Sequence, residues 1–310
     1  MIKIKSITQE IDQYMKSYFT WESYFSGYFS GAVLVAQKNK VLLNKGYGFS
    51  NLEHNVTNHS KTKFRIGSIT KQYTAVALLH LCQMNNISVH CGIDKYLTNY
   101  PNGQSISIHH LLTHTSGIPN LNYFHSMRLH TSIEVLVERF KDLPLLSIPG
   151  EQFLYSNAGY ILSALIIESI SGMSYGEYLR KYLFEPLLMK STLSTAIGAG
   201  NLYSTVEDLY LWDRTIAENK YIFSEGFTRL LFTPYKNDYG YGWFISDEHY
   251  SDTNIYKTRI HHAGGVNGFS GEYSRIIEDD LTIIVLSNFD TTPVYTITKR
   301  IIEMVLESNS

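Results

Sequence analysis

Hydrophobic residues recur at helical spacing in the middle of the chain and follow strand-like patterns near both ends. Residues 6–19 place apolar side chains on one side of a predicted helix. Residues 31–36 and 40–44 are apolar runs separated by three polar residues, which indicates a β-hairpin. Longer segments with helical spacing follow, and we expect further helices over residues 68–85, 105–112, 131–143, 158–171 and 175–184.

The pattern changes after residue 235. Apolar and alternating segments predict antiparallel strands over residues 241–246, 254–261, 271–277 and 281–286. A final helix is expected over residues 294–306. Two capping-box patterns, Thr131–Glu134 and Ser204–Glu207, mark predicted helix starts. Strands at both ends with helices between them favour an α+β fold, a mainly antiparallel sheet flanked by helices and built from both chain ends.

This organisation predicts two domains. Residues 1–90 and 200–310 would form a discontinuous α/β sheet domain, and residues 91–199 an inserted, mostly helical lobe. We expect the active site in the cleft between these two domains.

The composition excludes several classes of partner. The 310 residues include 26 basic and 28 acidic ones, a formal net charge of −2, so binding to nucleic acid or to an anionic membrane is not expected. The apolar runs are far shorter than the ~20 residues of a membrane span. No signal peptide is visible, so we expect a cytoplasmic protein as written, or a secreted or periplasmic one if a signal was removed.

The chain has two cysteines, Cys82 and Cys91, and two free thiols are favoured over one bridge.

The first candidate for chemistry is the pair Ser68 and Lys71, at the start of a predicted helix. Residues three apart on a helix lie one turn apart on the same face, so the lysine amine can reach the serine hydroxyl. A free serine is a weak nucleophile and needs such a neighbouring base. Alone, the pattern also fits a helix cap beside a solvated lysine, so other motifs must support it.

Ser-x-x-Lys is a motif of serine acyl transfer that has two partner motifs further along a chain, and both positions are filled here. Tyr155 and Asn157 are two apart in an extended segment, where their side chains point the same way. Residues 262–265, His-Ala-Gly-Gly, end a predicted strand, and a backbone N–H there can complete an oxyanion hole. Each motif alone also fits a core tyrosine, a turn asparagine or a loop histidine, and only their conjunction favours catalysis.

Together these motifs resemble the serine β-lactamase and penicillin-binding-protein-like superfamily, in its class C-like branch. That branch includes β-lactamase-related hydrolases, D-amino-acid peptidases, DD-carboxypeptidases and esterases, and the resemblance implies a β-lactamase/transpeptidase-like fold. The similarity covers nearly the whole chain and is specific for the superfamily but not for a substrate. It is carried by Phe29–Val35, Phe64–Lys71, His110–Pro119, Pro149–Tyr160, Gly200–Leu209, Tyr241–Trp243 and His262–Phe269.

The resemblance implies three catalytic residues. Ser68 is similar in position to the nucleophile that becomes acylated, and Lys71 to its proton partner. Tyr155 resembles the general base for acylation and for activating the deacylating water.

The resemblance also implies substrate contacts. Asn157 is similar to a residue that contacts the substrate amide, and His262 and Gly264 belong to the substrate-binding strand. The backbone N–H groups of Ser68 and Gly265 resemble the oxyanion hole.

The chain departs from its relatives at two places. His262 stands where true β-lactamases carry a lysine, and a histidine is largely neutral at neutral pH, so we expect weak or no β-lactamase activity. Only seven residues separate Thr192 from Gly200, where many relatives have a longer excursion beside the active site. This shortening predicts a more open cleft and a longer acyl or peptide substrate.

Metal or nucleotide chemistry has little support. His110 and His114 have a spacing that can bind zinc, but no neighbouring Glu or Cys supplies a third ligand. No glycine-rich phosphate loop follows a strand, so no cofactor is expected.

Three functions stay open. The first is a serine hydrolase that acts through an acyl-enzyme on a small ester or on a peptide or D-amino-acid amide. The second is an acyl transferase or macrocyclase, in which an amine or alcohol outcompetes water. The third is a non-catalytic, penicillin-binding-like sensor, against which the intact Ser68, Lys71 and Tyr155 argue. The sequence does not decide the oligomeric state.

Overall fold

The computed structural model describes residues 6–18, 29–120, 132–194, 198–218, 225–250 and 255–309. Its backbone packing divides the chain into two compact units. The first comprises residues 1–67, 203–214 and 246–310, and the second residues 68–202 and 215–245. No helix among the described residues is both long and apolar enough to cross a membrane.

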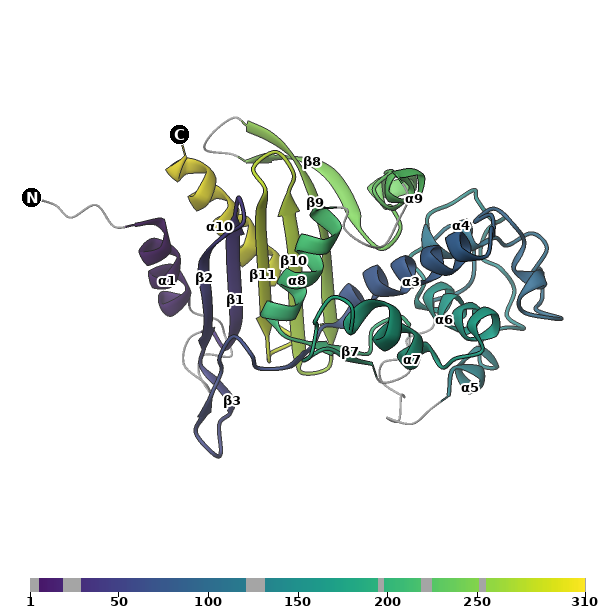
Figure 1. Ribbon diagram of the computed structural model, residues 1–310, viewed down its shortest axis with the longest axis horizontal. Coiled ribbons are helices and arrows are strands. Elements are labelled where there is room, and N and C mark those ends of the chain that lie inside the picture. The colour runs from purple at the N-terminus through teal and green to yellow at the C-terminus, as the bar shows by residue number, and fades with distance from the viewer. Residues whose placement is uncertain are drawn as a thin grey trace, which may run out of the picture. The chain divides into compact units, whose positions relative to one another are not determined.

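The first unit contains a six-stranded sheet with the strand order β2-β1-β11-β10-β9-β8 (Figure 1). The two N-terminal strands extend the sheet that the C-terminal strands form, because β1 pairs antiparallel with β11. The remaining registers that are defined, β1 with β2, β10 with β11 and β9 with β10, are also antiparallel. The strands are β1 Gly31–Gln37, β2 Lys40–Tyr47, β8 Phe244–Tyr250, β9 Ile255–Val266, β10 Phe269–Ile276 and β11 Leu281–Ser287.

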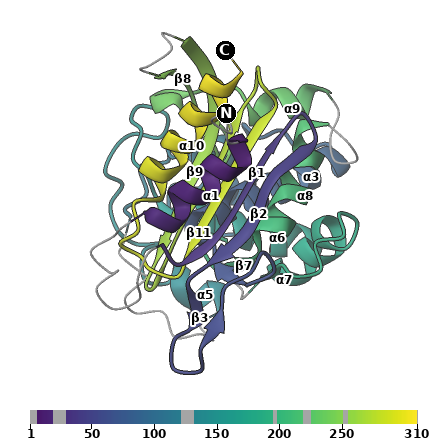
Figure 2. The ribbon, with the colours of Figure 1, turned by 90° about the vertical axis from the view of Figure 1, so that its left-hand side faces the viewer.

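Two helices from opposite ends of the chain, α1 (Ile7–Ser17) and α10 (Val294–Ser308), cover one face of this sheet (Figure 2). Their apolar stripes pack on every second residue of the central strands, since side chains alternate between the two faces of a strand. This core combines Ile11 and Met15 of α1 with Val33, Val35, Ile283 and Val285 of the sheet and Ile297 and Ile301 of α10.

Helix α8 (Val206–Ala217) reaches the sheet through a buried carboxylate. Asp213 is fully buried and accepts hydrogen bonds from Tyr273 Oη at 2.6 Å and Thr282 Oγ1 at 2.8 Å. Arg275 donates to the same carboxylate at 3.0 Å, and Arg214 donates to it at 2.6 Å. A buried charge is tolerated where it is paired and hydrogen-bonded in this way.

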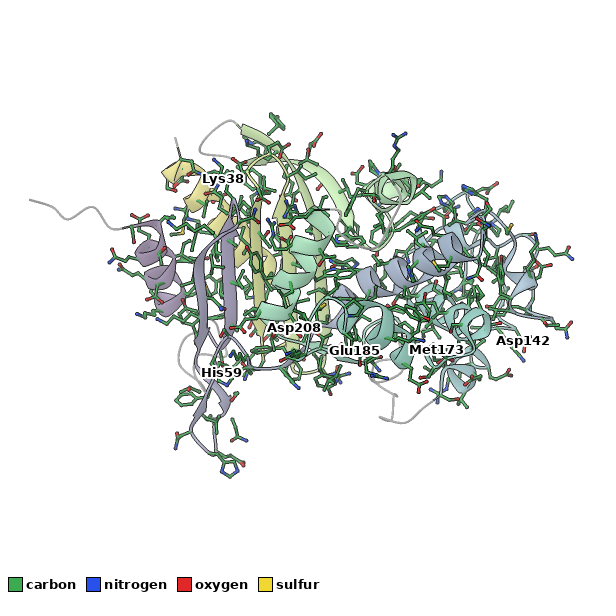
Figure 3. The ribbon with its side chains drawn as sticks, viewed as in Figure 1. Lys38, His59, Asp142, Met173, Glu185 and Asp208 are labelled. Atoms are coloured by element: carbon green, nitrogen blue, oxygen red, sulfur yellow. The ribbon has the colours of Figure 1, made fainter. Side chains whose placement is uncertain are left out.

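The β1–β2 hairpin turns at two residues in the left-handed region. Lys38 has φ 48° and Asn39 has φ 63°, the geometry that matches the twist of a tight hairpin, and Lys38 projects at this turn (Figure 3). Further along, β3 (Phe49–Asn51) and β4 (Val56–Thr57) form a small ribbon, and β5 (Phe64–Arg65) pairs with β7 (Leu202–Ser204).

The second unit is mostly helical. Its centre is the pair α3 (Thr70–Met84) and α6 (Asn157–Ser171), which pack against each other. Both helices are buried on nearly every side, which is why neither shows a strong apolar stripe. The other described elements of this unit are α4 Ile108–Leu112, α5 Ile133–Val137, α7 Tyr175–Leu179, a π-helical turn Arg180–Phe184, β6 Leu193–Ser194 and α9 Glu225–Leu231, with short 3-10 turns at Gly67–Ile69, Ile93–Lys95 and Lys236–Asp238.

The predicted fold class, a mainly antiparallel sheet flanked by helices, is confirmed. The unit boundaries differ from the predicted ones, since α3 and residues 215–245 belong to the helical unit. The prediction that Ser204 caps a helix is wrong, because Thr205 Oγ1 accepts the hydrogen bond from the Asp208 N–H at 3.1 Å. Thr131, the other predicted cap, lies outside the described residues. The sequence analysis missed α9 and the short strands β3 to β7.

Candidate active site

Ser68 lies in the 3-10 turn Gly67–Ile69, which leads directly into α3. Lys71 occupies the first turn of that helix, one turn beyond Ser68, and its side chain is fully buried. Its Nζ atom lies 3.0 Å from Ser68 Oγ. The structure therefore joins the serine and the lysine as their spacing predicts.

Lys71 Nζ also donates to two neutral oxygens of the second unit. Asn157 Oδ1 accepts at 2.7 Å and the Ala199 carbonyl oxygen at 2.8 Å. Burial lowers the pKa of Lys71 well below its ordinary value, because a charged amine loses its hydration in this interior. The amine is thus biased toward its neutral form.

A neutral amine fits this set of partners in one orientation. The oxygens of Asn157 and Ala199 can only accept, so they take the two N–H bonds of a neutral Lys71. Its lone pair then faces the Ser68 hydroxyl, which can donate its proton. This is the arrangement of a general base beside a nucleophile.

Tyr155 completes the group. It forms a side-chain hydrogen bond with Ser68, and its ring centroid lies 4.9 Å from Lys71 Nζ. Burial raises the pKa of the Tyr155 phenol, and the hydrogen bond with Ser68 offsets only part of that rise. The phenol is therefore protonated at neutral pH and can act as a proton donor.

Asn157 is placed by the start of α6. Ser156 caps the helix by accepting from the Gly159 N–H, and the Asn157 N–H donates to Asn120 Oδ1 at 3.0 Å. Because its backbone is held at this point, the Asn157 carboxamide oxygen can face Lys71. In the structure Asn157 thus serves the lysine, in addition to the substrate contact that the resemblance implies.

The sequence analysis missed three contributors to this group. The Ala199 carbonyl carries no side-chain signal, and Asn120 lies in a loop without a motif. Tyr160 places its ring 5.5 Å from Lys71 Nζ and donates to the Leu112 carbonyl at 2.9 Å. Only Tyr160 could have been noticed, as a tyrosine on the buried helix that carries Asn157.

The downstream motif lies on β9 of the first unit. His262 is paired with Tyr273 across the sheet, and Gly264 and Gly265 are paired with Gly271 and Ser270. His262 is only 3% exposed, and its Nδ1 donates to the Ala263 carbonyl oxygen at 2.6 Å, since a carbonyl can only accept. In its neutral form this imidazole presents Nε2 as an acceptor.

Gly67 contacts this strand and directly precedes Ser68 in the chain. It has φ 53°, and a Cβ atom there would lie 2.6 Å from Gly265 N and 2.9 Å from Gly264 C. Glycine is required on both grounds, since only it adopts this conformation freely and allows so close a backbone approach. Ser68, Lys71, Tyr155 and Asn157 lie in the second unit and the β9 motif in the first, and their joint action stays a prediction.

The other candidates have different roles. His110 forms a capping box with Ser107, and its Nε2 lies near Gly150. His261, the neighbour of His262 on β9, was not a candidate and contacts Glu272 Oε1 through Nδ1 at 3.1 Å. Among the described residues, no group of three or more His, Cys, Asp and Glu side chains could hold a metal ion. Cys82 and Cys91 are free thiols, and Cys91 is partly exposed.

Comparison with known proteins identifies the family. The model of the Beta-lactamase family matches residues 7–303. The chain belongs to the Beta-lactamase family. Its members are generally serine hydrolases that act on small amide, ester or β-lactam substrates.

Individual relatives of this Beta-lactamase family chain are distant. PbpX of Bacillus subtilis (strain 168), named as a penicillin-binding protein, is 26% identical over 287 residues, which cover 82% of this chain and 69% of PbpX. Two solved structures are similar. The octameric penicillin-binding protein homologue from Pyrococcus abyssi has a TM-score of 0.79 and 26% identity, covering 90% of this chain and 74% of that one. The D-amino acid amidase from Ochrobactrum anthropi SV3 has a TM-score of 0.83 and 18% identity, covering 98% and 100%, and shows the fold alone.

Proposed function

We propose that this chain is a serine hydrolase that forms an acyl-enzyme on Ser68 and cleaves small esters or peptide and D-amino-acid amides. The observation that carries the proposal is the set of partners around Lys71 Nζ, with Ser68 Oγ at 3.0 Å and two oxygens that can only accept. An ammonium could donate to all three oxygens, but burial lowers the pKa of Lys71 and favours the neutral amine, which donates to the two oxygens that can only accept and turns its lone pair toward the serine. A surface lysine beside a helix cap would have neither the burial nor these partners.

The pKa directions assign the proton transfers. Lys71, whose pKa burial lowers, takes the Ser68 proton while the serine oxygen bonds to the substrate carbonyl carbon. Tyr155, whose pKa burial raises, gives its proton to the departing alcohol or amine, and Lys71 then returns a proton to the phenol. In this assignment Lys71 is the general base for acylation, whereas the resemblance implied that Tyr155 has that role.

The second half-reaction releases the acyl group. Water attacks the carbonyl carbon of the Ser68 ester and gives a proton to the same Lys71–Tyr155 pair. The bond between that carbon and Ser68 Oγ then breaks, the pair returns the proton to Oγ, and the acyl group leaves as an acid. In both halves the negative oxygen of the tetrahedral intermediate would take hydrogen bonds from the backbone N–H groups of Ser68 and Gly265, as the resemblance implies. Support for Gly265 comes from its contact with Gly67, the residue that precedes the nucleophile.

An ester or amide substrate is preferred over a β-lactam for an electrostatic reason. A lysine would offer a fixed positive charge to the β-lactam carboxylate, whereas the imidazole of His262, whose Nδ1 faces the Ala263 carbonyl, carries no fixed charge. The fold shared with a D-amino acid amidase makes D-amino-acid amides a sensible first class to assay.

The test is the intact mass of the protein after treatment with a fluorophosphonate probe. We expect one adduct on the wild type and none on Ser68→Ala. Ser163→Ala is the matched control, because Ser163 is buried in α6 and donates to the Gly159 carbonyl at 2.9 Å. Equal labelling of the wild type and Ser68→Ala, or no labelling of a folded wild type, would overturn the proposal. A panel of esters, D- and L-amino-acid amides and β-lactams then defines the substrate, and added amine or alcohol acceptors report acyl transfer.

A further inference from the structure

His114 is a buried residue whose backbone adopts the left-handed conformation. It lies just after α4, is fully buried, and has φ 57°, in the left-handed region. A residue with a Cβ atom is strained there and persists only when its surroundings hold it. The surroundings of His114 are the segment that carries Tyr155.

The backbone N–H groups of Leu154 and Ser156, the two residues that flank Tyr155, both donate to His114. The Leu154 N–H donates to the His114 carbonyl oxygen at 2.8 Å, and the Ser156 N–H donates to His114 Nδ1 at 3.1 Å. One residue therefore fixes the backbone before and after the tyrosine. In the left-handed conformation of His114, its carbonyl oxygen and its ring both face the segment that carries Tyr155.

The imidazole also supports the phenol ring. The ring centroids of His114 and Tyr155 are 4.1 Å apart, with an angle of 34° between the planes. Tyr239 packs on the same imidazole with a centroid distance of 4.6 Å. Because Nδ1 accepts a hydrogen bond, the proton of the neutral ring is on Nε2.

We propose that His114 is the positioning residue for Tyr155, holding the phenol at Ser68 through the Leu154 and Ser156 amides and through the ring contact. The inference rests on the proposed function, since it concerns the proton donor of that reaction. His114 acts through Tyr155, so its removal lowers the acylation rate and leaves substrate affinity nearly unchanged. A displacement of about 1 Å in such a group can lower a rate about 10²-fold.

Two substitutions separate the hydrogen bond from the ring. His114→Asn keeps an acceptor oxygen near the position of Nδ1 and tolerates the left-handed backbone, but removes the ring. His114→Phe keeps an aromatic ring against Tyr155 but offers no acceptor to the Ser156 N–H. We measure kcat and KM on one ester, and the rate of fluorophosphonate labelling, at a temperature at which both variants are folded by near-UV circular dichroism.

We expect His114→Phe to lose about 10²-fold in kcat and in labelling rate with KM changed less than about twofold. His114→Asn should recover at least about tenfold of that loss. A folded His114→Phe with wild-type kcat, or a His114→Asn no faster than His114→Phe, would overturn the proposal.

A measurement without substrate separates this inference from the proposed function. Hydrogen exchange of the Ser156 amide, followed by NMR, should quicken in His114→Phe and stay slow in His114→Asn, relative to the Leu154 amide as internal reference. If Ser68 is never labelled but this exchange pattern is seen, the acyl-enzyme proposal fails while the positioning of Tyr155 by His114 is supported. If labelling is normal and the exchange is unchanged in His114→Phe, the positioning role itself is wrong.

Discussion

Lys71 Nζ lies 3.0 Å from Ser68 Oγ inside an interior that excludes water from the amine. The two residues are one helical turn apart, so their approach follows from local geometry. The chemical value of the pair comes from its surroundings, because the oxygens of Asn157 and Ala199 orient the amine and burial lowers its pKa.

The first prediction concerns the pH dependence of acylation. Lys71 acts in its neutral form, so the labelling rate rises with pH and levels off above the pKa of Lys71. Because burial lowers that pKa, the plateau begins below about pH 10.4, the ordinary value for a lysine. Stopped-flow labelling from pH 5 to pH 10 measures the profile. Lys71→Arg, which keeps a cation but cannot lose its proton, should react about 10²–10⁴-fold more slowly at every pH. A rate that falls as the pH rises would contradict the assignment of the base.

The second prediction separates the two tyrosines near Lys71. Tyr155→Phe keeps the ring and loses the proton donor, so kcat should fall about 10²–10⁴-fold with little change in stability. Tyr160→Phe removes the hydrogen bond to the Leu112 carbonyl and should cost about 1 kcal/mol of stability with kcat nearly unchanged. Steady-state kinetics and urea unfolding of both variants check this. Equal losses of kcat in the two would mean that packing, and not the Tyr155 hydroxyl, supports the reaction.

The sequence could predict the parts of the site that a motif or a helical spacing records. Ser68, Lys71, Tyr155 and Asn157 were all expected, and the structure brings these four together. The sequence could not predict that the Ala199 carbonyl accepts a hydrogen bond from Lys71, because every residue carries a backbone oxygen and the residue type gives no signal. His114 was considered only for its zinc-compatible spacing from His110, since nothing in the sequence shows that its ring lies on Tyr155.

Fold prediction succeeded and failed for similar physical reasons. The β1–β2 hairpin and α10 were expected because their apolar periodicity is local and strong. The boundary at residue 67 was not, because α3 is buried on nearly every side and its sequence does not say which unit it packs into. The start of α8 was misplaced by one residue, since Ser204 and Thr205 are equally good caps by type.

The third prediction tests the close approach beside the nucleophile. Gly67→Ala places a Cβ atom 2.6 Å from Gly265 N, in addition to an unfavourable positive φ. Gly172→Ala is its matched control, because Gly172 has φ 66° but nothing within 4 Å of an added Cβ atom. Both should lose about 1–2 kcal/mol of stability from the backbone, and only Gly67→Ala should also lose fluorophosphonate labelling. Normal labelling of folded Gly67→Ala would remove the support for Gly265 as an oxyanion donor.

The fourth prediction concerns the buried carboxylate that anchors α8. Asp213→Asn leaves the guanidinium groups of Arg214 and Arg275 without that negative partner and disturbs the acceptor of Tyr273. Breaking a buried pair on one side costs about 3–5 kcal/mol, so the unfolding midpoint in urea should drop sharply. Glu138→Gln, which removes an exposed pair with Lys141, should cost about 0–1 kcal/mol. A loss in Asp213→Asn as small as this control would show that the network adds little to the stability of the first unit.

The last prediction concerns the charge at position 262. The wild type should turn over nitrocefin poorly compared with esters, because the buried His262 imidazole donates Nδ1–H to the Ala263 carbonyl and supplies no fixed positive charge for the β-lactam carboxylate. His262→Lys supplies an ammonium group, and hydrogen bonds to charged groups are about twice as strong as neutral ones. We therefore expect kcat/KM for nitrocefin to rise about tenfold, with no gain for a neutral ester of similar size. His262→Gln is the control for size and polarity, since it keeps a neutral acceptor without adding a charge. If nitrocefin is already hydrolysed as fast as the best ester, or if His262→Lys raises both substrates equally, the charge at this position does not decide between β-lactams and esters.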